Sequence, residues 1–208
     1  MRLILPAFVI AAVLLVSGPG RAQDPTPSDN PEMAAMLEAD QAVRHGMTPE
    51  RLRDRAFLQN MIAEDAERRR RTRALLEAGA LRTARDYRAA AFVFQHGSTP
   101  EDYLLAHSLA VAALARGDSE SAWIAAATLD RYLQMTGKAQ IYGTQTRKTP
   151  DGPPTLDPYD RDLVPDSLRT ALGVPPRADQ DARLAALNAA PAPPVPAPPA
   201  NANGPDGS

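Results

Sequence analysis

The hydrophobic pattern is helical from about residue 31 to residue 136, because apolar residues recur every three or four positions and no segment alternates as a strand would. Signals for helix starts and ends divide this pattern. Asn30 before Pro31 and Thr99 before Pro100 are typical of starts, and Gly46 is typical of an end. The pattern predicts helices over about residues 31–45, 49–76, 84–95, 100–116 and 119–136.

Short connections join the last three of these helices. Such connections place consecutive helices antiparallel, so we expect two helical hairpins that share the helix over residues 100–116. No sequence period recurs three times, as a solenoid would require. The predicted fold class is therefore all-α, a small bundle of antiparallel helical hairpins. The expected buried stripe of the shared helix consists of Leu105, Ser108, Leu109 and Ala112.

The N-terminus has the features of a secretory leader. Arg2 precedes an apolar run from Leu3 to Val16, and the small residues Gly20 and Ala22 precede Gln23. The run is shorter than the roughly 20 residues of a membrane span, so we expect a signal peptide that is removed before Gln23. This predicts a periplasmic or secreted protein with no membrane contact beyond export. The alternative is a retained leader that anchors the protein to the membrane.

Composition shifts divide the rest of the chain. After the helical region, short helices are expected at residues 166–172 and 179–189, and the proline-rich end is expected to be disordered. The predicted organisation is a signal peptide at residues 1–22, a linker at 23–30, a helical domain at 31–146, a loop-rich extension at 147–190 and a disordered Pro/Ala-rich tail at 191–208.

Overall composition narrows the class of protein. The chain has 208 residues, of which 44% are hydrophobic, 5% are aromatic and 21 are prolines, which is enough for one modest core. It has no cysteine, which excludes disulfides, thiolate metal sites, thiol nucleophiles and a lipid-modified cysteine. A net charge of −2 argues against nucleic acid as a partner.

Four consecutive arginines at residues 68–71 form a locally basic segment in this weakly charged chain. Acidic residues stand four positions before three of these arginines, with Glu64 before Arg68, Asp65 before Arg69 and Glu67 before Arg71. On a helix this spacing forms ion pairs, which indicates a solvated helix face. The alternative interpretation is a phosphate-binding patch.

Two histidines are the main candidates for chemistry. Folding the last two long helices about Gly117 brings His107 near Asp130, and such a pair serves either in acid/base catalysis or as a structural hydrogen bond. His96 ends a helix, where its position is explained by capping. A metal site from His96, His107 and Asp130 lacks both the HExxH and the i,i+4 histidine spacing. No metal and no cofactor are therefore predicted.

The segment from Gln140 to Gln145 has an unusual mixture of residues after the last long helix. It combines Tyr142, a turn-forming Gly143, Thr144 and two glutamines. One interpretation is that the segment folds back and satisfies exposed helix ends with its side chains. The other is that it lines a pocket.

Four blocks of residues resemble a bacterial family of uncharacterised helical proteins. Its members are marked by a Gln-His pair, a helix with Asp-Arg and a Tyr-Gly-Thr-Gln loop. The blocks in this chain run from Asp86 to Gly97, Pro100 to His107, Ala127 to Leu133 and Gln140 to Gln145. The resemblance covers about residues 82–145, with an extension to 176, and implies no activity. The polar positions that it marks are Gln95, His96, His107, Asp130, Arg131, Tyr142, Thr144 and Gln145.

Two functional hypotheses follow from these residues. The first is an exported helical module that binds a protein, a peptide or a small ligand, with binding residues among Gln95, His96, Arg131, Tyr142, Thr144 and Gln145. The second is a hydrolase-type enzyme in which His107 is the general base and Asp130 orients it.

Overall fold

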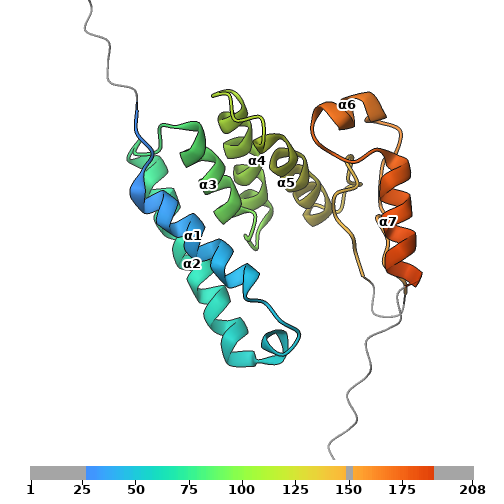
Figure 1. The fold of residues 1–208 in the computed structure, drawn as a ribbon, viewed down its shortest axis with the longest axis horizontal. Helices are drawn as coiled ribbons and strands as arrows, with labels where there is room; N and C mark the ends of the chain where they lie inside the picture. The colour runs from blue at the N-terminus through green and yellow to red at the C-terminus, as the bar shows by residue number, and fades with distance from the viewer. Residues whose placement is uncertain (1–26, 149–151, 190–208) are drawn as a thin grey trace, which may run out of the picture.

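The computed structural model describes residues 27–148 and 152–189 of the chain. The described part is all-α, with isolated bridges in place of strands, which confirms the predicted fold class. Figure 1 shows the helices following one another in chain order across the molecule. Their bounds are α1 Pro31–His45, a 3₁₀ turn Arg51–Arg53, α2 Arg55–Glu77, α3 Ala84–Phe94, α4 Pro100–Leu114, α5 Ser121–Met135, α6 Asp166–Ala171 and α7 Arg177–Ala189.

Local capping explains most of these bounds. The Asn30 side chain accepts a hydrogen bond from the Met33 N–H at 3.0 Å, and Thr99 does the same for Asp102, in each case with proline at the first helical position. The expected start of the second helix at residue 49 was wrong. Asp54 caps that helix instead, since its carboxylate accepts hydrogen bonds from two N–H groups of the first turn.

The apolar core lies where α3 packs between α1 and α4, and α4 in turn packs against α5. Small side chains dominate it, including Ala90, Ala106 and Ala110, and they allow the helices to approach closely. The larger core side chains Phe94 of α3 and Met33 of α1 are fully buried. This core fixes the orientation of α4 and α5, on which several of the candidate site residues lie.

The stripe expected on α4 was partly wrong. Leu109 is buried, but Ser108 is exposed, and the other buried residues of the helix are small ones. The reason is that α4 packs against both α3 and α5, so two of its faces are covered. The buried residues of α4 are Ala106, Leu109, Ala110 and Ala113.

The arginine run of α2 is not a uniformly solvated face. Arg68 is 8% exposed and pairs with Asp65 at 2.5 Å, while its Nε lies 3.8 Å from Asp40 of α1. Arg44 of α1 lies 3.2 Å from Asp40 and 2.6 Å from Asp65. The helices α1 and α2 are therefore held together by a largely buried cluster of two aspartates and two arginines. The expectation of a solvated face was wrong for Arg68, because α1 packs against α2 and places Asp40 and Arg44 next to the Arg68–Asp65 pair.

The remaining arginines of the run also have carboxylate partners within the protein. Arg69 lies 3.7 Å from Asp102 of α4, and Arg70 pairs with Glu67 at 2.6 Å. Arg71 pairs with Glu32 of α1. All four arginines of the run therefore have a carboxylate partner within the protein, which argues against the phosphate-binding alternative.

After α5 the chain forms a loop-rich extension. Gln140 N–H donates to the Pro158 carbonyl at 3.0 Å, and Asp160 N–H donates back to the Gln140 carbonyl at 2.9 Å. Helices α6 and α7 lie within two residues of the predicted short helices. Figure 1 shows both on the side of α5 that is away from α1 and α2. The predicted leader and tail, at residues 1–22 and 191–208, lie outside the described residues.

Within residues 27–148 and 152–189, no helix combines the length and the apolar character that crossing a membrane would require.

Candidate functional site

Asp130 of α5 is fully buried and is occupied by the loop that follows the helix. One carboxylate oxygen accepts hydrogen bonds from the N–H groups of Ile141 at 2.8 Å and Tyr142 at 3.0 Å. The other accepts from the N–H and the hydroxyl of Thr144, at 2.9 and 2.8 Å. Four donors match the acceptor capacity of one carboxylate. We call this set of contacts the Asp130 clamp.

The structure does not join His107 to Asp130. None of the hydrogen bonds or ion pairs of Asp130 in the described part of the chain involves His107, whose Nδ1 instead lies 2.9 Å from the Ala125 carbonyl. The pairing of α4 with α5 was anticipated, and one interpretation also had residues 140–145 folding back, but Asp130 was not expected to be their partner. The acid/base pair therefore stays a prediction without a contact between its two members.

Three further buried polar side chains hold the same loop. Gln140 receives the Gln145 N–H at 3.0 Å and donates its own amide to the carbonyls of Gln145 and Leu156. Gln180 of α7 donates to the Tyr142 carbonyl at 2.7 Å. Arg169 of α6, which is 0% exposed, donates to the Tyr142 carbonyl as well and to the Gln180 side chain. The loop is thus a packed junction between α5 and the extension.

Sequence reasoning missed the roles of Gln140, Arg169 and Gln180. Arg169 does fall in the segment that the family resemblance would extend into, and that position was the one available signal. Their roles depend on contacts with backbone carbonyls up to 38 residues away. Helical periodicity carries no information about such partners.

Gly143 explains the turn in this loop. Its φ is +65°, and a Cβ there would lie 2.8 Å from both the Gln180 Oε1 and the Tyr159 ring. Only glycine meets both conditions. The pKa of the neighbouring Tyr142 is raised, because burial disfavours the phenolate and the nearby Asp130 carboxylate adds to the effect.

Both interpretations of the loop are partly reflected in the structure. Gln145 donates to the Ala127 carbonyl of α5 at 3.3 Å, as expected of a segment that folds back on a helix. Gly143 and Thr144 also line a pocket of about 310 Å³ beside Trp123 and α7. Most of the loop's partners, however, are bound through its backbone and not through its side chains.

A second pocket contains more of the predicted site residues. It has a volume of about 370 Å³, and we call it the Arg131 pocket. Arg131 of α5 lies with its guanidinium 5.9 Å from the Tyr103 ring and donates from Nη1 to the Gln95 carbonyl at 2.9 Å. Its lining residues are Tyr103, Arg131, Gln134, Met135, Gln145 and Arg147.

The polar groups of the Arg131 pocket are incompletely paired. Arg131 Nε and Gln134 Nε2 are buried and have no hydrogen-bond partner in the described part of the chain. Arg131 and Arg147 form no ion pair there either, and no acidic residue lines the pocket. Buried donors without partners cost about 1–3 kcal/mol each. The other buried side-chain atoms without a partner in the described part are single atoms of Asp40, Arg68, His96 and Arg169, and none of these residues lines the Arg131 pocket.

His96 belongs to a different place in the molecule. Its Nε2 lies 3.5 Å from Asp40 Oδ2, and its carbonyl accepts from Arg69 Nη1 at 2.8 Å. It therefore borders the buried cluster of α1 and α2 and does not line the Arg131 pocket. Among residues 27–148 and 152–189, no group of three or more His, Asp and Glu side chains is arranged to hold a metal ion.

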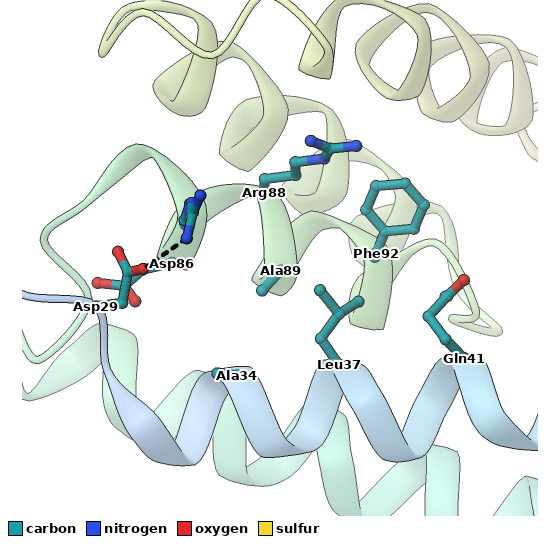
Figure 2. A pocket seen from close by; sticks show the side chains of 9 residues that line it. Asp29, Ala34, Leu37, Gln41, Asp86, Arg88, Ala89 and Phe92 are labelled. Atoms are coloured by element: carbon teal, nitrogen blue, oxygen red, sulfur yellow. Dashed lines mark ion pairs between the residues drawn. The ribbon is translucent and has the colours of Figure 1, made fainter.

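The largest of these three pockets is a groove of about 500 Å³ between α1 and α3, shown in Figure 2. Leu37 projects from α1 toward α3, where Phe92 borders the groove, and Asp29 and Asp86 lie at the other end (Figure 2). Those charges already have partners. Arg85 lies 3.6 Å from Asp29, and Arg88 pairs with Glu120. None of the site residues predicted from the sequence lines this groove.

Comparisons of the chain with protein-family models, with curated proteins and with solved structures give no match. The family resemblance of residues 82–145 therefore stays a prediction.

Proposed function

We propose that the chain is an exported helical binding module whose ligand occupies the Arg131 pocket. The observation that carries this proposal is the pair of buried donors without partners, Arg131 Nε and Gln134 Nε2, on adjacent turns of one helix beside an open pocket. Both atoms are covered by protein in the free chain, so a ligand acceptor reaches them when the side chains over them shift, and it then relieves a cost that the free protein bears.

Preorganisation supports the same proposal. The Asp130 clamp holds residues 141–144 against α5, and this fixes where Gln145 and Arg147 stand opposite Arg131. The Arg147 backbone is held as well, since its N–H and carbonyl pair with Thr155 at 2.7 and 2.8 Å. A pocket whose walls are fixed before binding loses less conformational entropy when a ligand arrives.

The α1–α3 groove is larger but is a poorer candidate. Its arginines are paired with carboxylates of the same chain, so a ligand would have to displace an existing partner. In the Arg131 pocket no such competition exists among the described residues. Charge pairing therefore favours the smaller pocket over the larger one.

A fragment screen on the isotope-labelled full chain tests the proposal. Acidic, neutral and basic compounds are added in turn, and chemical shifts are followed for backbone amides and for arginine Nε–H groups. We expect saturable shifts that map to the six lining residues of the Arg131 pocket. Hits that map instead to the α1–α3 groove, or an absence of saturable hits at any site, would overturn the proposal.

Export is tested separately. We expect the mature protein, recovered from cells that express the full chain, to begin at Gln23 by N-terminal sequencing. Recovery of the intact N-terminus in a membrane fraction would support the retained-leader alternative instead.

A further inference from the structure

The donor geometry of the Arg131 pocket carries an inference about the chemistry of the ligand, and it rests on the proposed function. The guanidinium of Arg131 is anchored at one corner, because Nη1 donates to the Gln95 carbonyl at 2.9 Å. Its face is covered by Tyr103, whose hydroxyl is in turn fixed to the Gly97 carbonyl at 2.8 Å. The guanidinium is therefore held in one orientation.

The remaining donors of Arg131 form a fork. The N–H groups of Nε and Nη2 point in nearly the same direction in any guanidinium, and neither has a hydrogen-bond partner in the described part of the chain. Nε is covered in the free protein, so a ligand that uses both donors has to displace the side chains over Nε. Two parallel N–H groups match the two oxygens of a carboxylate, which is the reason that arginine binds carboxylates in a bidentate manner. Gln134 adds an amide donor without a partner one turn along α5.

The charges and apolar surfaces of the pocket agree with this donor pattern. Two of the six lining residues are arginines and none is acidic, so the pocket favours an anion. Met135 is 48% exposed and offers an apolar surface at the same place. The pocket thus combines a carboxylate fork with room for an aliphatic group.

We infer that the ligand of the Arg131 pocket is a carboxylate that carries an apolar side group. Two sources share this chemistry, a small aliphatic acid and the C-terminal residue of a peptide. The carboxylate accepts from Nε and Nη2 of Arg131, Arg147 supplies a second positive charge, and Met135 contacts the apolar group.

The test uses a matched pair of probes with the labelled full chain. N-acetyl-leucine carries a carboxylate, and N-acetyl-leucinamide has the same shape without the charge. We expect N-acetyl-leucine to shift the Arg131 Nε–H and Gln134 side-chain signals saturably, and the amide to bind about tenfold more weakly or worse. 4-Methylpentanoate, which keeps the carboxylate and the aliphatic group but lacks the peptide amide, serves as the small-acid arm. Affinity equal to that of N-acetyl-leucine indicates a small acid, and weaker affinity indicates a peptide end.

Variants separate charge from folding. Arg147 is exposed and its side chain makes no hydrogen bond among the described residues, so Arg147→Gln is expected to fold normally and to weaken N-acetyl-leucine binding several-fold. Arg131→Gln should weaken it about tenfold or more. Arg55→Gln, at an exposed arginine that begins α2, is the control and should leave the affinity unchanged.

Three outcomes would overturn the inference. Equal binding of the acid and the amide would show that the pocket binds ligands without selecting a carboxylate. Tighter binding of inorganic phosphate than of N-acetyl-leucine would assign the fork to another anion. No shift at the pocket with any acid would exclude a carboxylate ligand, while the neutral and basic compounds of the fragment screen decide the proposed function independently.

Discussion

Thr144 donates both its backbone N–H and its hydroxyl to a single carboxylate oxygen of Asp130, at 2.9 and 2.8 Å. The two residues are 14 positions apart, and this double contact joins the end of the helical bundle to the loop-rich extension. Asp130 therefore acts in the structure as an anchor for backbone, and its acceptor capacity is already used.

Replacement of Asp130 by asparagine should destabilise the protein. The side-chain amide of the variant would present N–H donors where the loop needs an acceptor, so at least one buried donor loses its partner. We expect a loss of about 2–4 kcal/mol in the free energy of unfolding, measured by chemical denaturation. Asp160→Asn is the control, since Asp160 is exposed, and it should cost less than about 0.5 kcal/mol. Equal costs for the two variants would contradict the clamp.

Two neighbouring arginines of α2 should differ sharply in their contribution to stability. Arg68 is buried against Asp65 and Asp40, whereas Arg70 forms an exposed pair with Glu67. Arg68→Ala leaves two buried carboxylates with Arg44 as their one remaining arginine partner, and it is expected to cost about 3 kcal/mol. Arg70→Ala should cost less than about 0.5 kcal/mol. Similar unfolding free energies for the two variants would mean that the arginine run is a solvated face after all.

Acid should weaken the start of α3 through Asp86. Burial alone raises the pKa of this carboxyl, but hydrogen bonds from the N–H groups of Arg82, Asn30 and Thr83 outweigh it and hold the pKa below its usual value. A depressed pKa in the folded state stabilises the protein above about pH 4, and this stabilisation is lost as the pH falls through the lower folded value.

We therefore expect Asp86→Asn to flatten the loss of stability in the acid range, measured as the unfolding free energy between about pH 5 and pH 2.5. Glu38→Gln, at an exposed position of α1 without an ion pair among the described residues, should leave the profile unchanged. An unchanged slope for Asp86→Asn would contradict this role.

Two glycines with the same backbone conformation should respond differently to alanine. Gly137 has φ +74°, and a methyl group added there would meet no atom within 4 Å, so Gly137→Ala is expected to cost about 1 kcal/mol from conformation alone. Gly143 has φ +65° but is crowded by Gln180 and Tyr159, which should add about 1–3 kcal/mol. Equal melting temperatures for the two variants would show that Gln180 and Tyr159 move aside for the added methyl group without a loss of stability.

The fold class and most helix bounds could be predicted because their causes are local. The caps at Asn30 and Thr99 act within three residues, and glycine stops act within one turn. The buried face of α4 was harder, because a helix that packs on two sides buries small residues such as Ala106 and Ala110 instead of one large apolar stripe. Single-stripe patterns describe helices with one covered face.

The site was predictable only in part, because its contacts are long-range. Asp130, Tyr142, Thr144 and Gln145 were all selected from the sequence, but their mutual arrangement depends on how residues 137–145 return over α5. Helical spacing predicts that Asp130 lies near His107, but it contains no information about a loop that competes for the same carboxylate. The same limit applies to Arg169, whose partners lie on three separate segments.

Preorganisation of the Arg131 pocket requires that the Asp130 clamp be closed before any ligand arrives. The most direct test is the amide hydrogen exchange of Ile141, Tyr142 and Thr144 in the ligand-free full chain, with the exposed Thr146 as an internal reference. We predict slow exchange at these three amides in the wild type, and a joint acceleration of about tenfold or more in Asp130→Asn, with Thr146 fast in both. Fast exchange at the three amides in the wild type would contradict this preorganisation.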